Sequence, residues 1–139
     1  MTPTIEGSCH CGNIRFELDT ETRLEEIITR ACDCSFCRLH GARTWSDPQG
    51  QARVIVRDAE QLQTYSFGSK STEFMICRTC GAYAGAAVTE GGETWCTLNL
   101  RLTGHRLDQQ AVSYGKESRT ERMARRRLLW TPTQIRSDL

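Results

Sequence analysis

The stretch Cys32-Asp-Cys34-Ser-Phe-Cys37 places three thiols within six residues of chain. Two shorter clusters, Cys9-His-Cys11 and Cys77-Arg-Thr-Cys80, bring the clustered cysteines to seven of the eight in this 139-residue chain. Thiols this close together in a sequence are typical of metal ligation. Two pairs and one triplet predict one metal site filled by four sulfurs and a second site with one position left open.

The two pairs have the character of half-sites. Cys77-x-x-Cys80 has the spacing of a zinc knuckle, in which two sulfurs face one ion at about 2.3 Å and a glycine permits the tight backbone. Cys9-x-Cys11 is also followed by a glycine and could supply the other two ligands. A site made of both pairs would connect the N-terminal segment to the middle of the chain and stabilise the fold. Spacing alone also allows the first pair to share a metal with Cys32 and Cys34.

The triplet, Cys32, Cys34 and Cys37, could hold a metal with one coordination position vacant. Three protein ligands and an exchangeable fourth are typical of catalytic zinc. Zinc is favoured because thiolate-only tetrahedral sites suit it, whereas an iron–sulfur cluster usually needs four cysteines. Three thiolates make the ion a poor activator of water, but a substrate thiol bound there would lose its proton. The triplet therefore predicts chemistry on thiols rather than hydrolysis.

The alternative is that the protein itself closes this second site with a fourth ligand. The side chains that could do so are Asp33, His40, Cys96, His10 and His105. His40 is the strongest of these candidates because it follows Cys37 by three residues. Cys96 alternates with Leu98 and Leu100, which predicts a buried core thiol at this position.

The composition limits the classes of partner. A formal net charge of +1 gives no reason to expect nucleic acid, and no apolar run approaches the roughly 18 to 20 residues that span a bilayer. Residues 1–8 have neither the basic nor the apolar region of a secretory signal. We therefore expect a cytoplasmic protein with reduced cysteines, in preference to a secreted disulfide framework.

Strand patterns predominate along the chain. Alternation and β-branched runs predict strands over residues 13–18, 26–31, 51–58, 62–67, 72–76, 83–88 and 94–100. Ser118-Arg-Thr-Glu121 predicts a capping box for a helix that ends before Pro132. We expect a single, mainly β domain over residues 1–139, with a β core at about 5–105 and a C-terminal tail whose helix covers about 118–130.

The cysteine motifs and their surroundings resemble the glutathione-dependent formaldehyde-activating enzyme family, also called the CENP-V/GFA domain family. The matching stretches are Gly7-Ser-Cys-His-Cys-Gly12 with Ile14-x-Phe16, Cys32-x-Cys34-Ser35-x-Cys37-Arg38 with Gly41-Ala42, Phe74-x-Ile76-Cys77-x-x-Cys80-Gly81, and Arg125-Arg126-Arg127 with Trp130-Thr131-Pro132. The resemblance covers nearly the whole chain. It implies the family's zinc-stabilised β-tent fold, built of several small coiled sheets, with two zinc ions per chain.

The resemblance also implies roles for the cysteines and an activity. By it, the structural zinc is bound by Cys9, Cys11, Cys77 and Cys80, and the catalytic zinc by the triplet. The implied activity is that of S-(hydroxymethyl)glutathione synthase, a carbon–sulfur lyase that joins a thiol such as glutathione to formaldehyde or a related small carbonyl. The other hypothesis is a non-catalytic, zinc-stabilised binding module of the same fold. A fourth protein ligand at the triplet, or an exposed apolar patch in place of a cleft, would favour the module.

Arginines are the candidate contacts for an anionic substrate. Arg38 lies beside the triplet and could meet such a substrate, with an ordinary salt bridge as the alternative. The predicted helix could present further guanidinium groups to the carboxylates of glutathione, and these belong to Arg119, Arg122, Arg125, Arg126 and Arg127. Their helical spacing is more typical of a solvated face, which is the interpretation we favour. The sequence leaves open the true thiol and carbonyl, the proton donor and the oligomeric state.

Overall fold

Eleven strands are hydrogen bonded into one sheet in the computed structural model, which describes residues 3–68 and 70–137. The strands are β1 (Thr4–Ser8), β2 (Ile14–Asp19), β3 (Ile28–Cys32), β4 (Thr44–Trp45), β5 (Gln51–Val56), β6 (Leu62–Tyr65), β7 (Glu73–Cys77), β8 (Tyr83–Glu90), β9 (Glu93–Asn99), β10 (Asp108–Val112) and β11 (Thr131–Ser137). The α-helices are α1 (Ser35–His40) and α2 (Arg119–Leu129). Short 3-10 turns cover Leu24–Glu26, Ala59–Gln61 and Leu100–Thr103.

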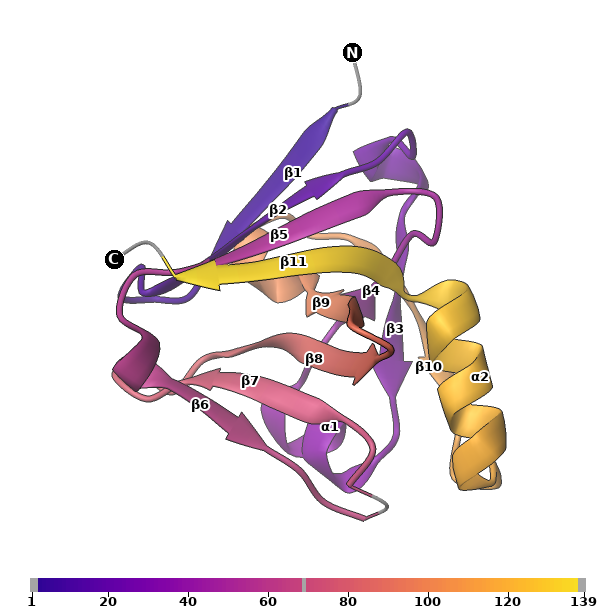
Figure 1. Ribbon diagram of the computed structural model, residues 1–139. Helices are drawn as coiled ribbons and strands as arrows, with labels where there is room; N and C mark the ends of the chain where they lie inside the picture. Colours follow the sequence, from indigo (N-terminus) through magenta and orange to yellow (C-terminus); the bar gives the residue numbers. More distant parts are fainter. Residues whose placement is uncertain (1–2, 69, 138–139) are drawn as a thin grey trace.

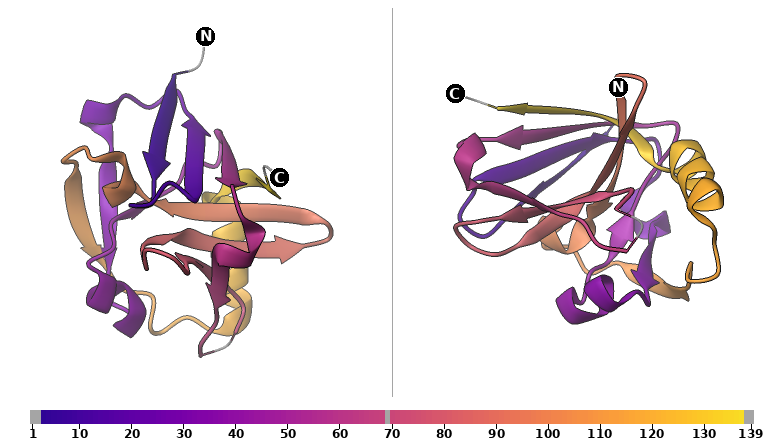
Figure 2. Two further views of the ribbon diagram at one scale, coloured as in Figure 1. Left: turned by 90° about the vertical axis from the view of Figure 1, so that its left-hand side faces the viewer. Right: turned by 60° about the horizontal axis from the view of Figure 1, so that its bottom comes forward.

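The sheet bends into two wings that spread apart like the sides of a tent (Figure 1). The first wing contains β1, β2, β5 and β11, and the second contains β6, β7, β8 and β9. Strand β11 joins them, because Thr131 and Pro132 pair with β9 while residues 133–137 pair with β5. The strands β4, β3 and β10 continue the sheet from the other half of β9, and β3 and β10 stand side by side at the left of the first view in Figure 2.

The core between the wings follows from the alternation of apolar residues. Ile14, Phe16 and Leu18 of β2 are all at most 1% exposed, and Phe16 lies opposite Val54 of β5. Burying each of these large side chains contributes roughly 1.5–3 kcal/mol to stability. A second core, near α1, gathers Phe36, Phe74, Tyr83 and Trp130. The two cysteine sites divide between these cores, which places each site in its own packed environment.

The expectation of a mainly β fold with a short C-terminal helix is confirmed. Helix α2 begins with the predicted capping box: the Glu121 amide donates to Ser118 Oγ at 3.1 Å, and the Ser118 amide donates to Glu121 Oε1 at 3.0 Å. The small sheets that the resemblance implies are hydrogen bonded to one another and form a single bent sheet. Neither of the described helices is long and apolar enough to cross a membrane.

The sheet extends beyond the expected β core at about 5–105. Strand β10 and strand β11 lie outside that range, and β11 follows the helix directly. Most residues of β11 are exposed, so this strand lacks the apolar alternation that would identify it from sequence. Helix α1 was not expected either. It begins after Cys34 as N-cap and ends at Gly41, whose φ of 60° suits a residue without a side chain.

Candidate metal centres and the cavity beside them

The fold brings the two cysteine pairs together. Cys9 and Cys11 lie in the turn after β1, Cys77 is the last residue of β7, and Cys80 lies in the turn that follows it. All four sulfurs are within 4.8 Å of one another, with Cys9 Sγ to Cys11 Sγ at 3.8 Å and Cys11 Sγ to Cys77 Sγ at 3.5 Å. Four sulfurs about 2.3 Å from a tetrahedral zinc are about 3.8 Å apart. This four-cysteine cluster therefore has the dimensions of a closed zinc site, and of the two pairings that spacing allowed it selects one.

The two turns of the four-cysteine cluster share one local design. Gly12 and Gly81, which follow the two pairs, have φ values of 85° and 82°. In this left-handed region a glycine is strongly favoured, because a Cβ would be strained there. Backbone amides also point at the sulfurs: the Ile14 amide donates to Cys9 Sγ at 3.2 Å, and the Cys80 amide to Cys77 Sγ at 3.5 Å. Such donors stabilise thiolates, so both turns favour the charged form of the sulfurs, which is the form that binds a cation.

The triplet forms a second group, at the junction of β3 and α1. Cys32 ends the strand, Cys34 is the N-cap of the helix, and Cys37 lies in its first turn. The three sulfurs lie within 4.8 Å of one another. Cys34 Sγ accepts a hydrogen bond from the Cys37 amide at 3.3 Å, so helix formation and sulfur placement depend on the same residue. The site is therefore built by the turn that starts α1.

The thiols of the triplet influence one another's ionisation. Hydrogen bonds from Cys32 and Cys37 lower the pKa of the Cys34 thiol. The hydrogen bond with Cys34 raises the pKa of Cys32, and the hydrogen bonds with Cys32 and Cys34 raise that of Cys37. One charge at Cys34 thus suppresses charge at its neighbours. A divalent soft metal would remove this conflict, and the three-sulfur donor set is suited to zinc.

No fourth protein ligand joins the triplet among the residues that the structure describes. No other His, Cys, Asp or Glu there has a ligand atom within 4.8 Å of all three sulfurs. His40 is stacked on Phe36 with ring centroids 4.2 Å apart, and its Nδ1 lies 3.1 Å from the Phe36 carbonyl oxygen. Cys96 is fully buried in the core between the wings, as predicted. His10 and His105 are exposed.

The triplet opens into a cavity of about 300 Å³. One part of its wall is apolar and includes Phe74, Tyr83 and Trp130. Burial, together with the nearby triplet thiols, raises the pKa of Tyr83 well above its ordinary value, so its hydroxyl stays protonated. Another part, the arginine wall, consists of Arg30, Arg122, Arg125 and Arg126. A ligand of the triplet would therefore lie in a cavity that offers it both apolar side chains and guanidinium groups.

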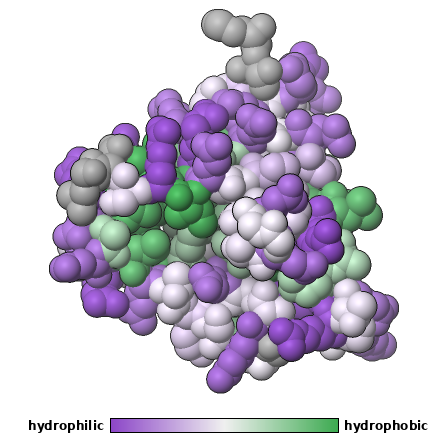
Figure 3. All heavy atoms as spheres, viewed as in Figure 1, coloured by the Kyte–Doolittle hydropathy of each residue, from purple (hydrophilic) through white to green (hydrophobic). Residues whose placement is uncertain are grey.

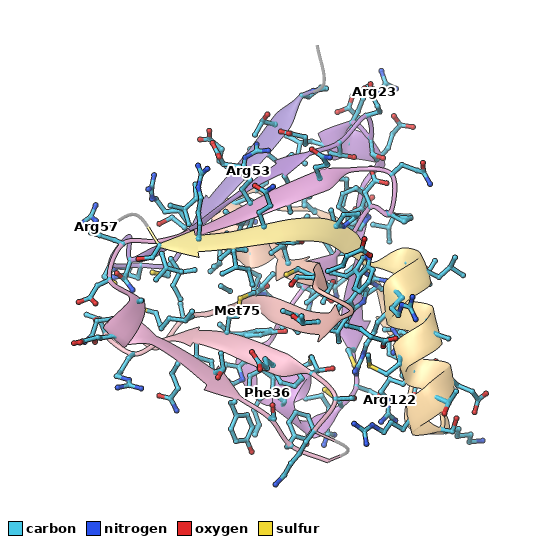
Figure 4. The ribbon with its side chains drawn as sticks, viewed as in Figure 1. Arg23, Phe36, Arg53, Arg57, Met75 and Arg122 are labelled. Atoms are coloured by element: carbon cyan, nitrogen blue, oxygen red, sulfur yellow. The ribbon has the colours of Figure 1, made fainter. Side chains whose placement is uncertain are left out.

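The arginine wall was not expected from the sequence. Arg122, Arg125 and Arg126 line the cavity, contrary to the favoured interpretation of the helical arginines as a solvated face. Figure 4 shows Arg122 extending from α2 toward the side of the molecule where Phe36 lies. Arg30 of β3 was missed, although it precedes Cys32 by two residues. That period of two, which places side chains on one face of a strand, was the available signal.

The four guanidinium groups differ in their partners. Arg125 donates to both carboxylate oxygens of Glu117, at 2.8 and 3.0 Å, and stacks over Tyr114 with 3.6 Å to the ring centroid. Arg30 donates to the hydroxyls of Ser46 and Thr97. Burial lowers the pKa of Arg30, and burial followed by the charges of Arg125 and Arg122 lowers the pKa of Arg126 to about 10.

The other predicted substrate contact lies elsewhere. Arg38 is exposed on α1 and does not contribute to the cavity wall. Arg119 and Arg127 line a groove on the other side of α2, where Arg127 Nη1 lies 3.0 Å from Glu90 Oε1. The arginines that share a cavity with the triplet therefore do not include Arg38, which follows Cys37 directly in the sequence.

Two comparisons with known proteins identify relatives. The family model described as glutathione-dependent formaldehyde-activating enzyme matches residues 4–114, a range that contains all seven clustered cysteines. Helix α2 and strand β11 lie outside that range. A crystal structure of a Rhodobacter sphaeroides protein is 30% identical in sequence, with a TM-score of 0.56, over 76% of this chain and 99% of that one.

Proposed function

Because the chain belongs to the glutathione-dependent formaldehyde-activating enzyme family, we propose that it is a two-zinc enzyme that adds a thiol to formaldehyde or a related small carbonyl. In the reaction, the thiol sulfur bonds to the carbonyl carbon and the carbonyl oxygen takes up a proton. With glutathione and formaldehyde the product is S-hydroxymethylglutathione. The reverse direction breaks the same carbon–sulfur bond, which makes the activity that of a carbon–sulfur lyase.

One observation carries the proposal: three thiols converge at the wall of a cavity, and no described residue completes their set. A zinc ion bound there would supply the positive charge that holds a substrate thiol as its nucleophilic thiolate. Phe74 and Trp130 give the cavity apolar wall, and the arginine wall offers charge to an anionic ligand. The four-cysteine cluster, by contrast, is complete and connects two distant turns, which fits a structural zinc.

The alternative of a non-catalytic binding module rests on features that are weaker here. It would be favoured by a closed metal site, and the described residues give no fourth ligand at the triplet. It would also be favoured by an apolar surface in place of a cleft. Apolar side chains do reach the surface between the two wings (Figure 3), but the triplet itself faces the cavity.

The eight cysteines form no disulfide bonds, which suits a reducing compartment such as the cytoplasm.

The test is catalysis of the exchange between glutathione, ¹³C-formaldehyde and their adduct, measured by NMR magnetisation transfer. The zinc-loaded protein should raise the exchange rate above the spontaneous one, and Cys34→Ser should abolish this increase while the protein stays folded. The serine hydroxyl in that variant would keep the N-cap acceptor that α1 needs. Rates equal to the spontaneous one for the zinc-loaded wild type, with glutathione and with simpler thiols, would refute the proposal.

Arg38→Ala tests the predicted contact at Arg38, and an unchanged KM for the thiol would remove that residue from the site.

A further inference from the structure

Arg126 differs from the two arginines beside it in the chain. Arg125 is paired with Glu117 and Arg127 with Glu90, whereas the side-chain partners of Arg126 are the hydroxyls of Ser71 and Thr72. Both hydroxyl contacts are made by its Nη1 atom. Its Nε atom is buried and has no hydrogen-bond partner among the described residues. The guanidinium carbon lies 5.2 Å from the Trp130 ring.

This arrangement leaves the Nε donor of the guanidinium group without an acceptor among the described residues. With Nη1 held by the hydroxyls, the Nε and Nη2 atoms present the parallel pair of donors that matches a carboxylate. Arginine remains charged, and a buried charge without a counter-ion is costly. An anion bound at this edge of the guanidinium group would supply the missing charge. The two hydroxyls would then fix the orientation of the fork.

The position of Arg126 relates this edge to the triplet. Both lie in the wall of the same cavity, whose volume of about 300 Å³ is at the lower end of the range for small-molecule sites, roughly 300–1,000 Å³. A single small molecule could therefore place its sulfur at the triplet and its anionic group at Arg126. Asp33 is the acidic residue in the described part of this wall, and it is exposed.

On the basis of the proposed function, we propose that the thiol substrate is a small anionic thiol and that Arg126 binds its carboxylate. Arg126 is then a specificity-determining residue contributed by α2, outside the matched range of the family model. Neutral thiols would reach the triplet but would lack this contact. The competing explanation is that Arg126 only fastens α2 to the segment at Ser71 and Thr72.

The experiment compares mercaptoacetate with 2-mercaptoethanol, two short thiols that differ in the carboxylate. Binding to cobalt(II)-loaded protein is followed by the thiolate–cobalt absorption bands. We expect the wild type to prefer mercaptoacetate, and Arg126→Gln to lower the affinity for mercaptoacetate by about ten- to a hundredfold, the loss of a charge-assisted hydrogen bond. The affinity for 2-mercaptoethanol should not change. Arg126→Lys should retain part of the preference, and Arg127→Gln, on the other side of α2, all of it.

Two results would overturn the inference: equal affinities of the wild type for the two thiols, or equal losses for both in Arg126→Gln, the mark of a purely structural role. A third arm separates the inference from the proposed function. If neither thiol altered the spectrum, the proposed function would fail, and acetate would be titrated instead while tryptophan fluorescence is recorded. Acetate binding that is lost in Arg126→Gln but kept in Arg127→Gln supports the anion subsite. No response of the wild type to acetate contradicts it.

Discussion

Removing the cross-link made by the four-cysteine cluster should destabilise the fold far more than removing the triplet metal. The double variant Cys11→Ser/Cys80→Ser takes away two of the four ligands. Cys11 is exposed and Cys80 is half-buried, so little core packing changes. The fully buried thiol of Cys77 and the nearly buried Cys9 stay in place. The loss of stability therefore reports the metal cross-link rather than a cavity in the core.

The expected magnitude follows from the sequence separation of the joined turns. Cys11 and Cys77 are 66 residues apart, and a cross-link closing a loop of that length stabilises a protein by about 4 kcal/mol in the chain-entropy model. That is a large part of the roughly 5–15 kcal/mol available to a typical domain. For a chain of this length it corresponds to a fall in Tm of about 10–20 °C.

The matched control is Cys32→Ser/Cys34→Ser, which removes two ligands of the triplet. The thiols of the triplet lie within six residues of chain, so a metal there closes no long loop, and a serine in place of Cys34 preserves the N-cap of α1. Thermal unfolding would be followed by circular dichroism in reducing buffer, with zinc measured by mass spectrometry. The reasoning is refuted if Cys11→Ser/Cys80→Ser loses one zinc and melts within about 3 °C of the wild type, or if the control is destabilised as strongly.

Three further predictions concern the metals and the scaffold. A chromogenic chelator should remove zinc in two phases: a fast one from the triplet, which faces the cavity, and a slow one from the four-cysteine cluster. Cys34→Ser should lose the fast phase. A single phase in the wild type would contradict the assignment of two different sites. Gly85→Ala should lower the free energy of unfolding in urea by about 1–3 kcal/mol, because a Cβ would lie 2.5 Å from the Thr97 carbonyl oxygen. Gly115→Ala, with open space around it, is the neutral control. Ser118→Ala should cost about 1 kcal/mol by urea unfolding, since it removes the capping box of α2; no loss would show that packing alone holds the helix.

Local spacing was sufficient to predict the short cysteine motifs whose sulfurs lie together in the structure. Cys77-x-x-Cys80 and the triplet are short motifs whose geometry depends on a single turn. The pairing of Cys9 and Cys11 with Cys77 and Cys80 depends instead on how the fold brings the ends of β1 and β7, which belong to different wings, close together. No spacing rule contains that information, and the family resemblance supplied it.

The arginine wall could not be predicted from sequence patterns. Helix α2 has no buried residue among its eleven, and its two leucines, Leu128 and Leu129, are exposed, so these apolar side chains do not mark the face that meets the protein. Arg126 and Arg127 are neighbours in sequence, yet one lines the cavity and the other pairs with Glu90 outside it. Their roles depend on the contact between the helix and the segment at Ser71 and Thr72.

The strand after the helix was missed for a related reason. Strand β11 is mostly exposed and contains Pro132, which has no amide to donate. It is held by backbone pairing to β5 and β9 rather than by apolar side chains. Such a strand carries almost no hydrophobic signal, although it joins the two wings of the sheet.

The most direct test of an open zinc site at the triplet is the first coordination shell of its metal, determined from a crystal structure of the zinc-loaded protein. We expect two zinc ions per chain, one bound by the four-cysteine cluster and one bound by Cys32, Cys34 and Cys37. The fourth position of the second ion should hold water or an added thiol. A protein side chain in that position, such as His40, or a triplet that binds no zinc, would contradict the open site.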